Sequence, residues 1–205
     1  MIFPFPYRYY PAVTDITVQD VQDMGIRALL LDIDGTLMQT RDMMPAPAVM
    51  AWLKEMQAQG ITLYILSNNK HPHRVEAFAK AIGAQWQYLA GKPSLKGFIK
   101  AQQELGLPKE QLALVGDQTY TDMLGCRRFG IKGLLVESTD TYLWYFWPRR
   151  LVELPFRFEV RRCSRCLDLR AAATVLIGPI RARCMRPDGC GSWAWTAMNI
   201  SVAAA

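Results

Sequence analysis

Short apolar runs alternate with segments of helical periodicity between residues 26 and 137. Four runs have the length and composition of buried strands, at residues 26–31, 61–66, 112–116 and 133–137. Pro45 and Pro47 open a segment of helical spacing that Gly60 stops, and Pro72 starts a helix that Gly83 closes. Further helices are expected over residues 94–105 and 119–129. Strands that alternate with helices in this way predict repeated βαβ units, and therefore an α/β fold with a mainly parallel sheet.

Three polar residues stand directly after three of the predicted strands. Asp32 follows the first strand, Ser67 the second and Asp117 the third. Ligands of open α/β sheets bind at the carboxyl ends of the strands, so we expect these side chains to meet at one edge of the sheet. This coincidence is the strongest functional signal in the sequence.

The segment Asp32-Ile33-Asp34-Gly35-Thr36 combines two carboxylates at a strand end. A carboxylate can attack phosphorus and form an aspartyl-phosphate, which divides one difficult displacement into two easier ones. The second carboxylate, two residues later, can protonate the leaving oxygen and then activate water. The threonine hydroxyl can orient neighbouring groups. The alternative is an Asp-Gly turn with a capping aspartate, because such pairs are common in turns.

Further along the chain, polar residues suit a phosphate group and a metal ion. Ser67 and Asn68 offer hydroxyl and amide donors for phosphoryl oxygens, with a helix N-cap as an equal alternative. Lys92 can neutralise an aspartyl-phosphate, although a single lysine is usually a solvated surface residue. Asp117 would supply a second carboxylate for a hard cation such as Mg²⁺. Asp122 would bind the metal through water or hold Lys92, or else is an acidic residue favoured in the first turn of a helix.

The order of the motifs DxDGT, SNN, KP and GDxxxxD is more specific than any one of them. Over roughly residues 7–155 this order resembles the four motifs of the haloacid dehalogenase superfamily. The segments LLLDIDGTL, SNNKHPHRVEAF, GKP and VGDQTYTD look most like the YqeG-type phosphatases of subclass IIIA. The resemblance implies a phosphoric monoester hydrolase with a Rossmann-like three-layer sandwich and no sizeable cap domain.

The resemblance also implies roles for individual residues. Asp32 would be the nucleophile and a metal ligand, and Asp34 the acid/base, which also binds Mg²⁺ through its carbonyl oxygen. Ser67 and Lys92 would bind phosphate, and Asp117 would bind Mg²⁺. The aspartate at position 34 favours a phosphatase over the dehalogenases of the superfamily, which lack that acid, and over its ATPases, which have threonine there.

Four further candidates come from residue type and position. Thr36 and Asn68 are predicted to contribute to phosphate binding, and Asp122 to support the site. Arg74 is predicted as a supporting residue near the phosphate, because a guanidinium group matches phosphate geometry.

The gaps between the motifs bear on the substrate. Thirty-five positions separate Asp32 from Ser67 and twenty-five separate Ser67 from Lys92, which leaves room for one helix each and none for a lid domain. An open site favours a large or surface-presented phosphoester, and similar phosphatases act on phosphatidylglycerophosphate, a membrane lipid. The segment YLWYFWPRR (142–150) mixes aromatic and basic residues, as membrane-contacting segments do. The alternative is that it packs against the edge of the domain.

A phospho-accepting signalling or binding module on a Rossmann-like scaffold is the main alternative function. Receiver domains also combine paired acids, a hydroxyl and a lysine on a parallel sheet. In receiver domains, however, the acidic pair and the accepting aspartate follow different strands, whereas Asp32 and Asp34 follow one strand. A catalytically inactive scaffold is a further alternative, but all the catalytic residue types are present.

The net charge of +6 belongs mostly to the last part of the chain. Residues 1–155 carry 16 Lys or Arg and 15 Asp or Glu, whereas residues 156–205 carry 8 Arg and 3 acidic residues. We therefore expect a capless phosphatase domain at 1–155, which does not bind nucleic acid, and an Arg/Cys-rich, poorly ordered tail at 156–205. The pairs Cys163/Cys166 and Cys184/Cys190 leave zinc binding as an alternative for the tail, although the second spacing is wide for a zinc knuckle. A non-native reading frame is a third interpretation of the tail.

The sequence contains no run of about 18 apolar residues and no secretory signal pattern. We therefore expect a cytoplasmic protein, with any membrane association confined to peripheral contact. Its expected cofactor is Mg²⁺ and its expected partner is a phosphorylated substrate. The sequence carries no signal for an oligomeric state.

Overall fold

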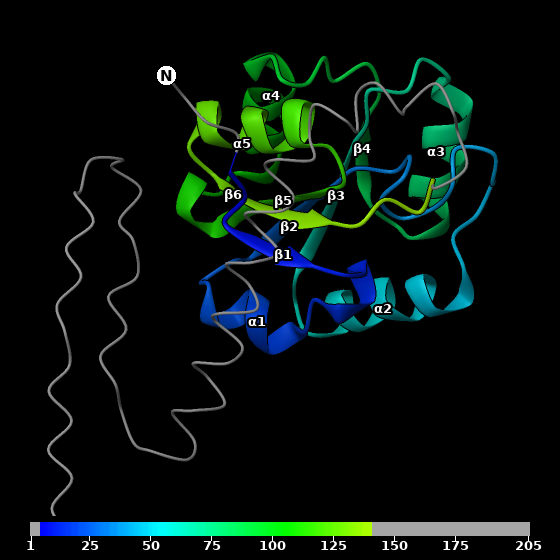
Figure 1. The fold of residues 1–205 in the computed structure, drawn as a ribbon, viewed down its shortest axis with the longest axis horizontal. Helices are drawn as coiled ribbons and strands as arrows, with labels where there is room; N and C mark the ends of the chain where they lie inside the picture. Colours follow the sequence, from blue (N-terminus) through cyan, green and yellow to red (C-terminus); the bar gives the residue numbers. More distant parts are fainter. Residues whose placement is uncertain (1–4, 141–205) are drawn as a thin grey trace, which may run out of the picture. The chain divides into compact units, whose positions relative to one another are not determined.

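A computed structural model describes residues 5–140 of the protein as an open α/β fold. Six strands, all parallel, form one sheet in the order β1-β6-β5-β2-β3-β4, and helices cover both of its faces (Figure 1). The predicted fold class is therefore confirmed. The predicted boundary at residue 155, the segment 142–150 and the cysteine-containing tail lie outside the described residues.

The elements alternate along the chain as the sequence predicts. The strands are β1 (Arg8–Tyr10), β2 (Ala28–Leu31), β3 (Thr62–Leu66), β4 (Gln85–Gln87), β5 (Leu112–Gly116) and β6 (Lys132–Val136). The α-helices are α1 (Val18–Asp23), α2 (Pro47–Ala58), α3 (Pro72–Ala81), α4 (Leu95–Leu105) and α5 (Leu124–Phe129). Two 3₁₀ turns are η1 (Val13–Asp15) and η2 (Lys109–Gln111), and a π-helical turn, η3 (Thr119–Met123), precedes α5.

The central strand β2 is buried on both faces. Leu29 and Leu31 pack into a core with α1, α2 and α3, whereas Ala28 and Leu30 pack into a second core with α4 and α5. Side chains alternate between the two faces of a strand, so a strand covered on both sides is apolar at every position. This explains why the run before Asp32 is continuous rather than alternating.

The helices α2 and α3 begin with proline. Pro47 opens α2 and Pro72 opens α3, where the missing N–H would have no helical partner. In α2 the indole N–H of Trp52 donates to the Ile16 carbonyl at 2.7 Å, so a large buried side chain keeps its polar atom satisfied. Each helix ends two residues before the glycine that was predicted to stop it.

Several details differ from the sequence-based expectation, and α1 is a helix that the sequence did not predict. β1 and β4 are strands that the sequence did not predict; each has three residues and lies at an edge of the sheet. Their polar sequences, RYY and QWQ, lack the apolar run of an inner strand. The helix predicted over 119–129 begins as a π turn, in which the Met123 N–H donates to the Gln118 carbonyl at 3.3 Å.

The direction of the chain across the sheet reverses between β2 and β5. From β2 the chain moves outward to β3 and β4, and it then returns to β5 on the other side of β2 and continues to β6. The carboxyl ends of two strands that part in this way leave a crevice between the loops that follow them. The topology alone therefore places a binding site after β2 and β5.

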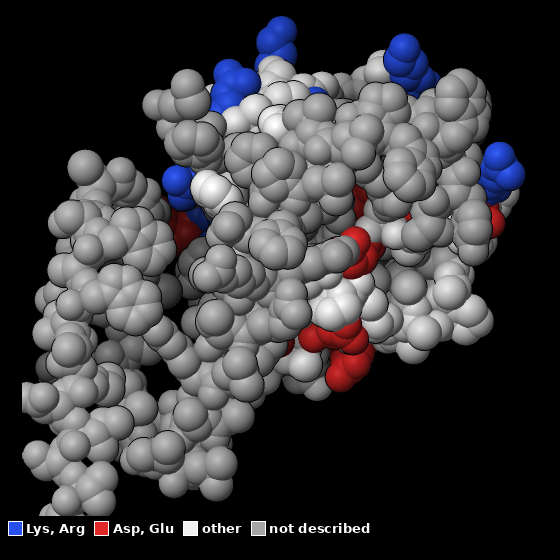
Figure 2. All heavy atoms as spheres, in the orientation of Figure 1, with Lys and Arg blue, Asp and Glu red and all other residues white. Residues whose placement is uncertain are grey.

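The described surface is mixed in charge. In the view of Figure 2 the visible Lys and Arg side chains lie mainly around the upper part of the domain, and the visible Asp and Glu side chains lie lower, mostly around and below the sheet. Within residues 5–140, no helix combines the length and the apolar character needed to cross a membrane.

Candidate active site

The candidate site lies at the point where the sheet reverses direction. Asp32 follows β2 directly, and its N–H donates to the Val115 carbonyl at 3.0 Å, which continues the β2–β5 pairing by one residue. Asp117 follows β5 directly. Backbone pairing thus brings these two acidic residues to neighbouring positions at the carboxyl edge of the sheet.

Lys92 lies between two carboxylates. Its Nζ is 2.8 Å from Asp32 Oδ1 and 2.8 Å from Asp122 Oδ1. Lys92 is 5% exposed, and Asp122 is completely buried. Because a buried charge is costly unless it is paired, the ammonium and the two carboxylates stabilise one another in this position.

The side-chain amide of Asn68 holds the backbone of Lys92. Asn68 Oδ1 accepts the Lys92 N–H at 2.8 Å, and Asn68 Nδ2 donates to the Lys92 carbonyl at 3.0 Å. The sequence predicts Asn68 as a phosphate ligand. Its amide is here engaged by the main chain of Lys92, so it fixes the lysine from the end of β3.

Ser67 and Thr36 supply the two predicted hydroxyl groups. Ser67 is 1% exposed, and its Oγ accepts the Asn69 N–H at 3.0 Å, so the hydroxyl can still donate its own proton. Thr36 Oγ1 donates to Asp117 Oδ1 at 3.4 Å, which is a long contact. Thr36 therefore contacts a carboxylate of the site, whereas Ser67 keeps a donor for another group.

Gly35 lets the backbone after β2 pass close to Asp117. Its φ is +82°, in the left-handed region that glycine adopts without strain. A Cβ at this position would lie 2.6 Å from Asp117 Oδ2 and 2.9 Å from Ser138 Oγ. The glycine of the DxDGT motif is thus required both by conformation and by space.

The π turn η3 brings Asp122 back towards β5. The Gln118 N–H donates to Asp122 Oδ2 at 3.1 Å, while Asp122 Oδ1 faces Lys92. A π turn makes backbone bonds from residue i+5 to residue i, and such turns are frequent at functional sites. The irregular start of this helix is therefore part of the geometry of the site.

Three carboxylates share the buried space around Lys92; we call them the carboxylate cluster (Asp32, Asp117 and Asp122). One oxygen atom from each lies within 4.8 Å of the others. Burial raises the pKa of Asp32 to about 8; Lys92 opposes this rise, and the charges of Asp122 and Asp117 add to it. Burial disfavours the charge on Lys92, but Asp122 and Asp32 outweigh burial and hold the pKa of Lys92 above its ordinary value.

The carboxylate cluster fits a divalent cation. When its three members are ionised and Lys92 is protonated, two negative charges remain uncompensated in a buried place. Carboxylate oxygens are preferred ligands of hard ions such as Mg²⁺. The cluster contains the predicted ligands Asp32 and Asp117 together with Asp122. The prediction for Asp34 concerns its carbonyl oxygen, and its side chain is not a member of the cluster.

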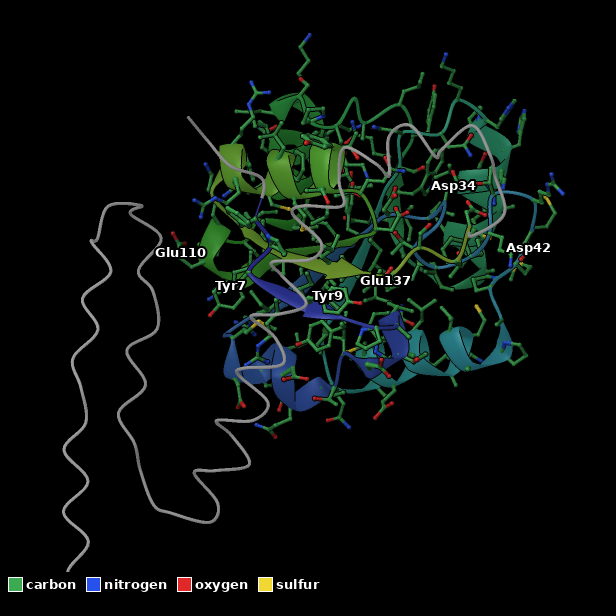
Figure 3. All side chains as sticks on the ribbon, in the orientation of Figure 1. Tyr7, Tyr9, Asp34, Asp42, Glu110 and Glu137 are labelled. Carbon is green, nitrogen blue, oxygen red and sulfur yellow. The ribbon has the colours of Figure 1, made fainter. Side chains whose placement is uncertain are left out.

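The Asp34 carboxylate is held towards α3 instead. Asn69 Nδ2 donates to Asp34 Oδ2 at 2.8 Å, and the Arg74 guanidinium forms an ion pair with Asp34 Oδ1. Figure 3 shows Asp34 beside α3. Asn69 was not among the predicted site residues; the only signal for it was its place in the SNN motif, two residues after Ser67.

Comparisons with known proteins agree with this geometry. Residues 41–130 match the family model described as haloacid dehalogenase-like hydrolase. Over 147 residues the chain is 31% identical to a protein named "Probable phosphatase YqeG" from Bacillus subtilis (strain 168). The match covers 70% of this chain and 85% of that protein.

Two solved structures are similar at lower sequence identity. A crystal structure of an uncharacterized protein from Listeria monocytogenes serotype 4b has a TM-score of 0.47 and 14% identity, covering 63% of this chain and 99% of the other. The cobalt-bound deoxy-D-mannose-octulosonate 8-phosphate phosphatase from Haemophilus influenzae has a TM-score of 0.45 and 15% identity, covering 55% of this chain and 69% of the other. At these scores the two structures carry no conclusion about function. The Bacillus subtilis relative and the family model, however, show that the chain belongs to the haloacid dehalogenase-like hydrolases.

Proposed function

We propose that the chain is a Mg²⁺-dependent phosphatase in which Asp32 is the nucleophile. The observation that carries this proposal is the placement of Asp32, 2.8 Å from a buried Lys92 and inside the carboxylate cluster. A carboxylate there can attack phosphorus while an ammonium balances the charge of the phosphoryl oxygens. The hydrolase family and the relative named as a probable phosphatase both support hydrolysis of a phosphoric monoester.

The proposed reaction has two steps. The first step requires Asp34 in its protonated form: an oxygen of the Asp32 carboxylate attacks phosphorus, the bond from phosphorus to the leaving oxygen breaks, and Asp34 gives that oxygen its proton. In the second, the Asp34 carboxylate takes a proton from water, the water oxygen attacks phosphorus, and the bond to Asp32 breaks. The products are an alcohol and inorganic phosphate, and both aspartates return to their starting protonation states.

The other residues of the site bind or orient. The Ser67 hydroxyl would donate to a phosphoryl oxygen, and Lys92 would balance the charge of the phosphoryl group. Thr36 and Asn68 would act through the residues they hold, Asp117 and Lys92. A Mg²⁺ ion held by the carboxylate cluster, with the carbonyl of Asp34 as a further ligand, would offset the negative charge of the carboxylates and the phosphate.

Hydrolysis of p-nitrophenyl phosphate by the full chain tests this proposal. With Mg²⁺, wild type is expected to hydrolyse the ester, and Asp32→Asn is expected to fall to the rate of a protein-free blank because the amide is no nucleophile. Asp23→Asn, a change at an exposed aspartate of α1, is the matched control and should keep the wild-type rate. Equal rates for wild type and Asp32→Asn would remove Asp32 from the mechanism.

Removal of the metal tests the cofactor separately. EDTA should abolish hydrolysis, and added Mg²⁺ should restore it. Mg²⁺ should also raise the Tm of wild type, and should raise that of Asp117→Asn much less, because this variant lacks one cluster carboxylate. A Tm that does not respond to Mg²⁺ in wild type would contradict magnesium binding.

We further propose a large or surface-presented substrate, such as a lipid phosphate of the phosphatidylglycerophosphate type. Within residues 5–140 the β2–β3 and β3–β4 connections each contain a single helix, which leaves the site without a cap. Four apolar side chains on the loops after β2 and β4 are 39–65% exposed: Met43, Met44, Tyr88 and Leu89. Apolar side chains at the rim of an open site suit an apolar substrate or a membrane surface.

Flotation with vesicles of phosphatidylglycerol tests the substrate proposal. The full chain should float with anionic vesicles, and a Met43→Ser/Leu89→Ser double variant should float less while keeping its rate on p-nitrophenyl phosphate. A cytoplasmic protein with peripheral membrane contact would behave in this way. If wild type shows no vesicle binding and prefers soluble phosphoesters, the lipid substrate is wrong and the phosphatase proposal still stands.

A further inference from the structure

We infer that Arg74 is a positioning residue, which holds the Asp34 carboxylate and the loop after β2 in one arrangement so that Asp34 meets the leaving oxygen of the substrate. This inference rests on the proposed phosphatase activity. It departs from the expectation that the guanidinium group of Arg74 itself binds phosphate.

All three nitrogens of the Arg74 guanidinium have partners within the protein. Nη1 pairs with Asp34 Oδ1, Nη2 donates to the carbonyls of Asp42 at 2.8 Å and Gln39 at 3.1 Å, and Nε donates to the Asp42 carbonyl at 3.1 Å. The side chain is 11% exposed. These bonds use four of the five guanidinium N–H groups and fix the plane of the group, so its geometry suits holding Asp34 and the loop more than substrate binding.

The Asp34 carboxylate is held at both of its oxygens. Arg74 takes Oδ1, and Asn69 Nδ2 donates to Oδ2 at 2.8 Å. Asn69 is itself fixed, because its Oδ1 accepts the His71 N–H at 2.8 Å. The carboxylate therefore cannot rotate without losing a charge-assisted hydrogen bond, and such bonds are about twice as strong as neutral ones.

The same guanidinium fastens the loop after β2. Between the two carbonyls that it binds lies Thr40, whose N–H donates to Asp140 Oδ1 at 3.0 Å and whose hydroxyl donates to Asp140 Oδ2. The loop is therefore tied to α3 on one side and to the segment after β6 on the other. Figure 3 shows Asp34 and Asp42 together at the α3 side of the domain. Arg74 thus couples the position of this loop to that of Asp34.

Proton transfer depends on such positioning, because the donor must lie within hydrogen-bond reach of the leaving oxygen. The dependence is strongest when that oxygen is basic. Phenolate is a basic leaving group and benefits from a proton, whereas p-nitrophenolate leaves more readily without one. Phenyl phosphate and p-nitrophenyl phosphate have nearly the same shape, so the ratio of their rates reports on Asp34 rather than on substrate fit.

The test compares kcat/KM for the two esters in Mg²⁺, using the full chain. This quantity reports the first phosphoryl transfer, in which Asp34 acts as the acid. Arg74→Ala is expected to lower kcat/KM about 100-fold for phenyl phosphate and less than about tenfold for p-nitrophenyl phosphate. Asn69→Ala should shift the ratio in the same direction. Arg74→Lys should recover part of the loss, because lysine can pair with Asp34 but cannot also bind both carbonyls.

Lys80→Ala is the matched control, since it removes an exposed ion pair with Glu76 on the same helix and should leave both rates unchanged. Equal losses on the two esters in Arg74→Ala and Asn69→Ala would overturn the inference, and so would unchanged rates. If Arg74→Ala does not fold, the test uses Arg74→Lys and Asn69→Ala instead. A larger loss of kcat/KM on phenyl phosphate than on p-nitrophenyl phosphate in these variants supports the inference, and equal losses overturn it. Failure of wild type to hydrolyse either ester would instead overturn the proposed function, and this inference with it.

Discussion

Gly116 lies directly against the carboxylate of Asp122. A Cβ at position 116 would be 2.5 Å from both Cγ and Oδ2 of Asp122, far inside normal contact distance. Asp122 is fully buried and lies 2.8 Å from Lys92, so any displacement of its carboxylate disturbs this ion pair. A glycine at the end of an inner strand weakens the strand but leaves room for a close approach, and here it lets the ion pair form.

Gly116→Ala is expected to displace Asp122 and, through it, Lys92. A shift of about 1 Å in a catalytic group can cost about 100-fold in rate, so kcat on p-nitrophenyl phosphate should fall by at least that order. Gly133→Ala is the matched control in β6, because its Cβ would meet the Sδ of Met123 at 2.8 Å and the side chain of Cys126 at 3.3 Å, and none of its three nearest atoms belongs to a carboxylate. Comparable rate losses in both variants would show that the contact with Asp122 has no special role.

The inner part of the fold was accessible from the sequence because burial dictates its pattern. Strands covered on both faces are apolar throughout, so β2, β3 and β5 could be recognised together with the polar residues after them. The edge strands β1 and β4 are different, because three-residue segments such as RYY and QWQ owe their conformation to the neighbouring strand rather than to their own pattern. Tertiary pairing outweighs intrinsic propensity there.

The residue types of the site could also be predicted, and the pair of Asp122 with Lys92 was one of the alternatives considered, but the other partnerships could not. The motif order indicated Asp32, Ser67, Lys92 and Asp117, and the structure brings Asp32, Lys92 and Asp117 to one edge of the sheet. The hold of Asn68 on the Lys92 backbone spans 24 positions and depends on where two loops meet in space. No local periodicity encodes such a contact.

Asn68→Ala tests the hold on Lys92. The change removes two hydrogen bonds, each contributing about 1 kcal/mol to stability, and frees the loop that carries the lysine. We expect the free energy of unfolding to fall by about 2 kcal/mol and kcat to fall about tenfold, because Lys92 is no longer held beside Asp32. Urea unfolding and steady-state kinetics measure the two effects.

Gln57→Ala is the control for Asn68→Ala. Gln57 Nε2 donates to the Ile82 carbonyl at 2.8 Å, so this variant loses a side chain–backbone bond of the same kind in the α2–α3 layer. It should lose stability while keeping kcat. A kcat loss in Gln57→Ala equal to that in Asn68→Ala would mean that lowered stability, rather than the position of Lys92, sets the rate.

The raised pKa of Asp32 makes the stability of the metal-free protein depend on pH. Burial raises this pKa from its ordinary 3.8 to about 8, so between these values the folded protein binds a proton that the unfolded chain releases. This contribution to stability is present below about pH 4 and is lost as pH rises through about 8. In EDTA, the Tm of wild type should therefore fall between pH 6 and pH 9.

Asp32→Asn is the control for this dependence, because it cannot ionise and should show a smaller decline. Mg²⁺ should raise the Tm of wild type more at pH 9 than at pH 6, since protons compete with the ion for the carboxylate cluster. If the Tm profiles of wild type and Asp32→Asn run parallel over this range in EDTA, Asp32 does not carry the raised pKa.

Lys92→Met removes the ammonium that pairs with Asp32 and Asp122 in the carboxylate cluster and leaves a side chain of similar length. Loss of one partner from a buried ion pair costs about 3–5 kcal/mol, because the remaining charge is left uncompensated. We expect a loss of this order in urea unfolding of the metal-free protein at pH 8, together with loss of phosphatase activity. Lys100→Met, which removes an exposed lysine 3.7 Å from Glu104, should change neither quantity appreciably.

The stability lost in Lys92→Met should depend on pH and on Mg²⁺. Lys92 acts to lower the pKa of Asp32, so its removal raises that pKa further and makes protonation of the cluster easier. The deficit relative to wild type should therefore shrink at pH 6. It should also shrink when Mg²⁺ is added at pH 8, because the ion then supplies the positive charge that the lysine provided. A deficit of the same size at pH 8, at pH 6 and in Mg²⁺ would indicate that lost packing, rather than uncompensated charge, accounts for the effect.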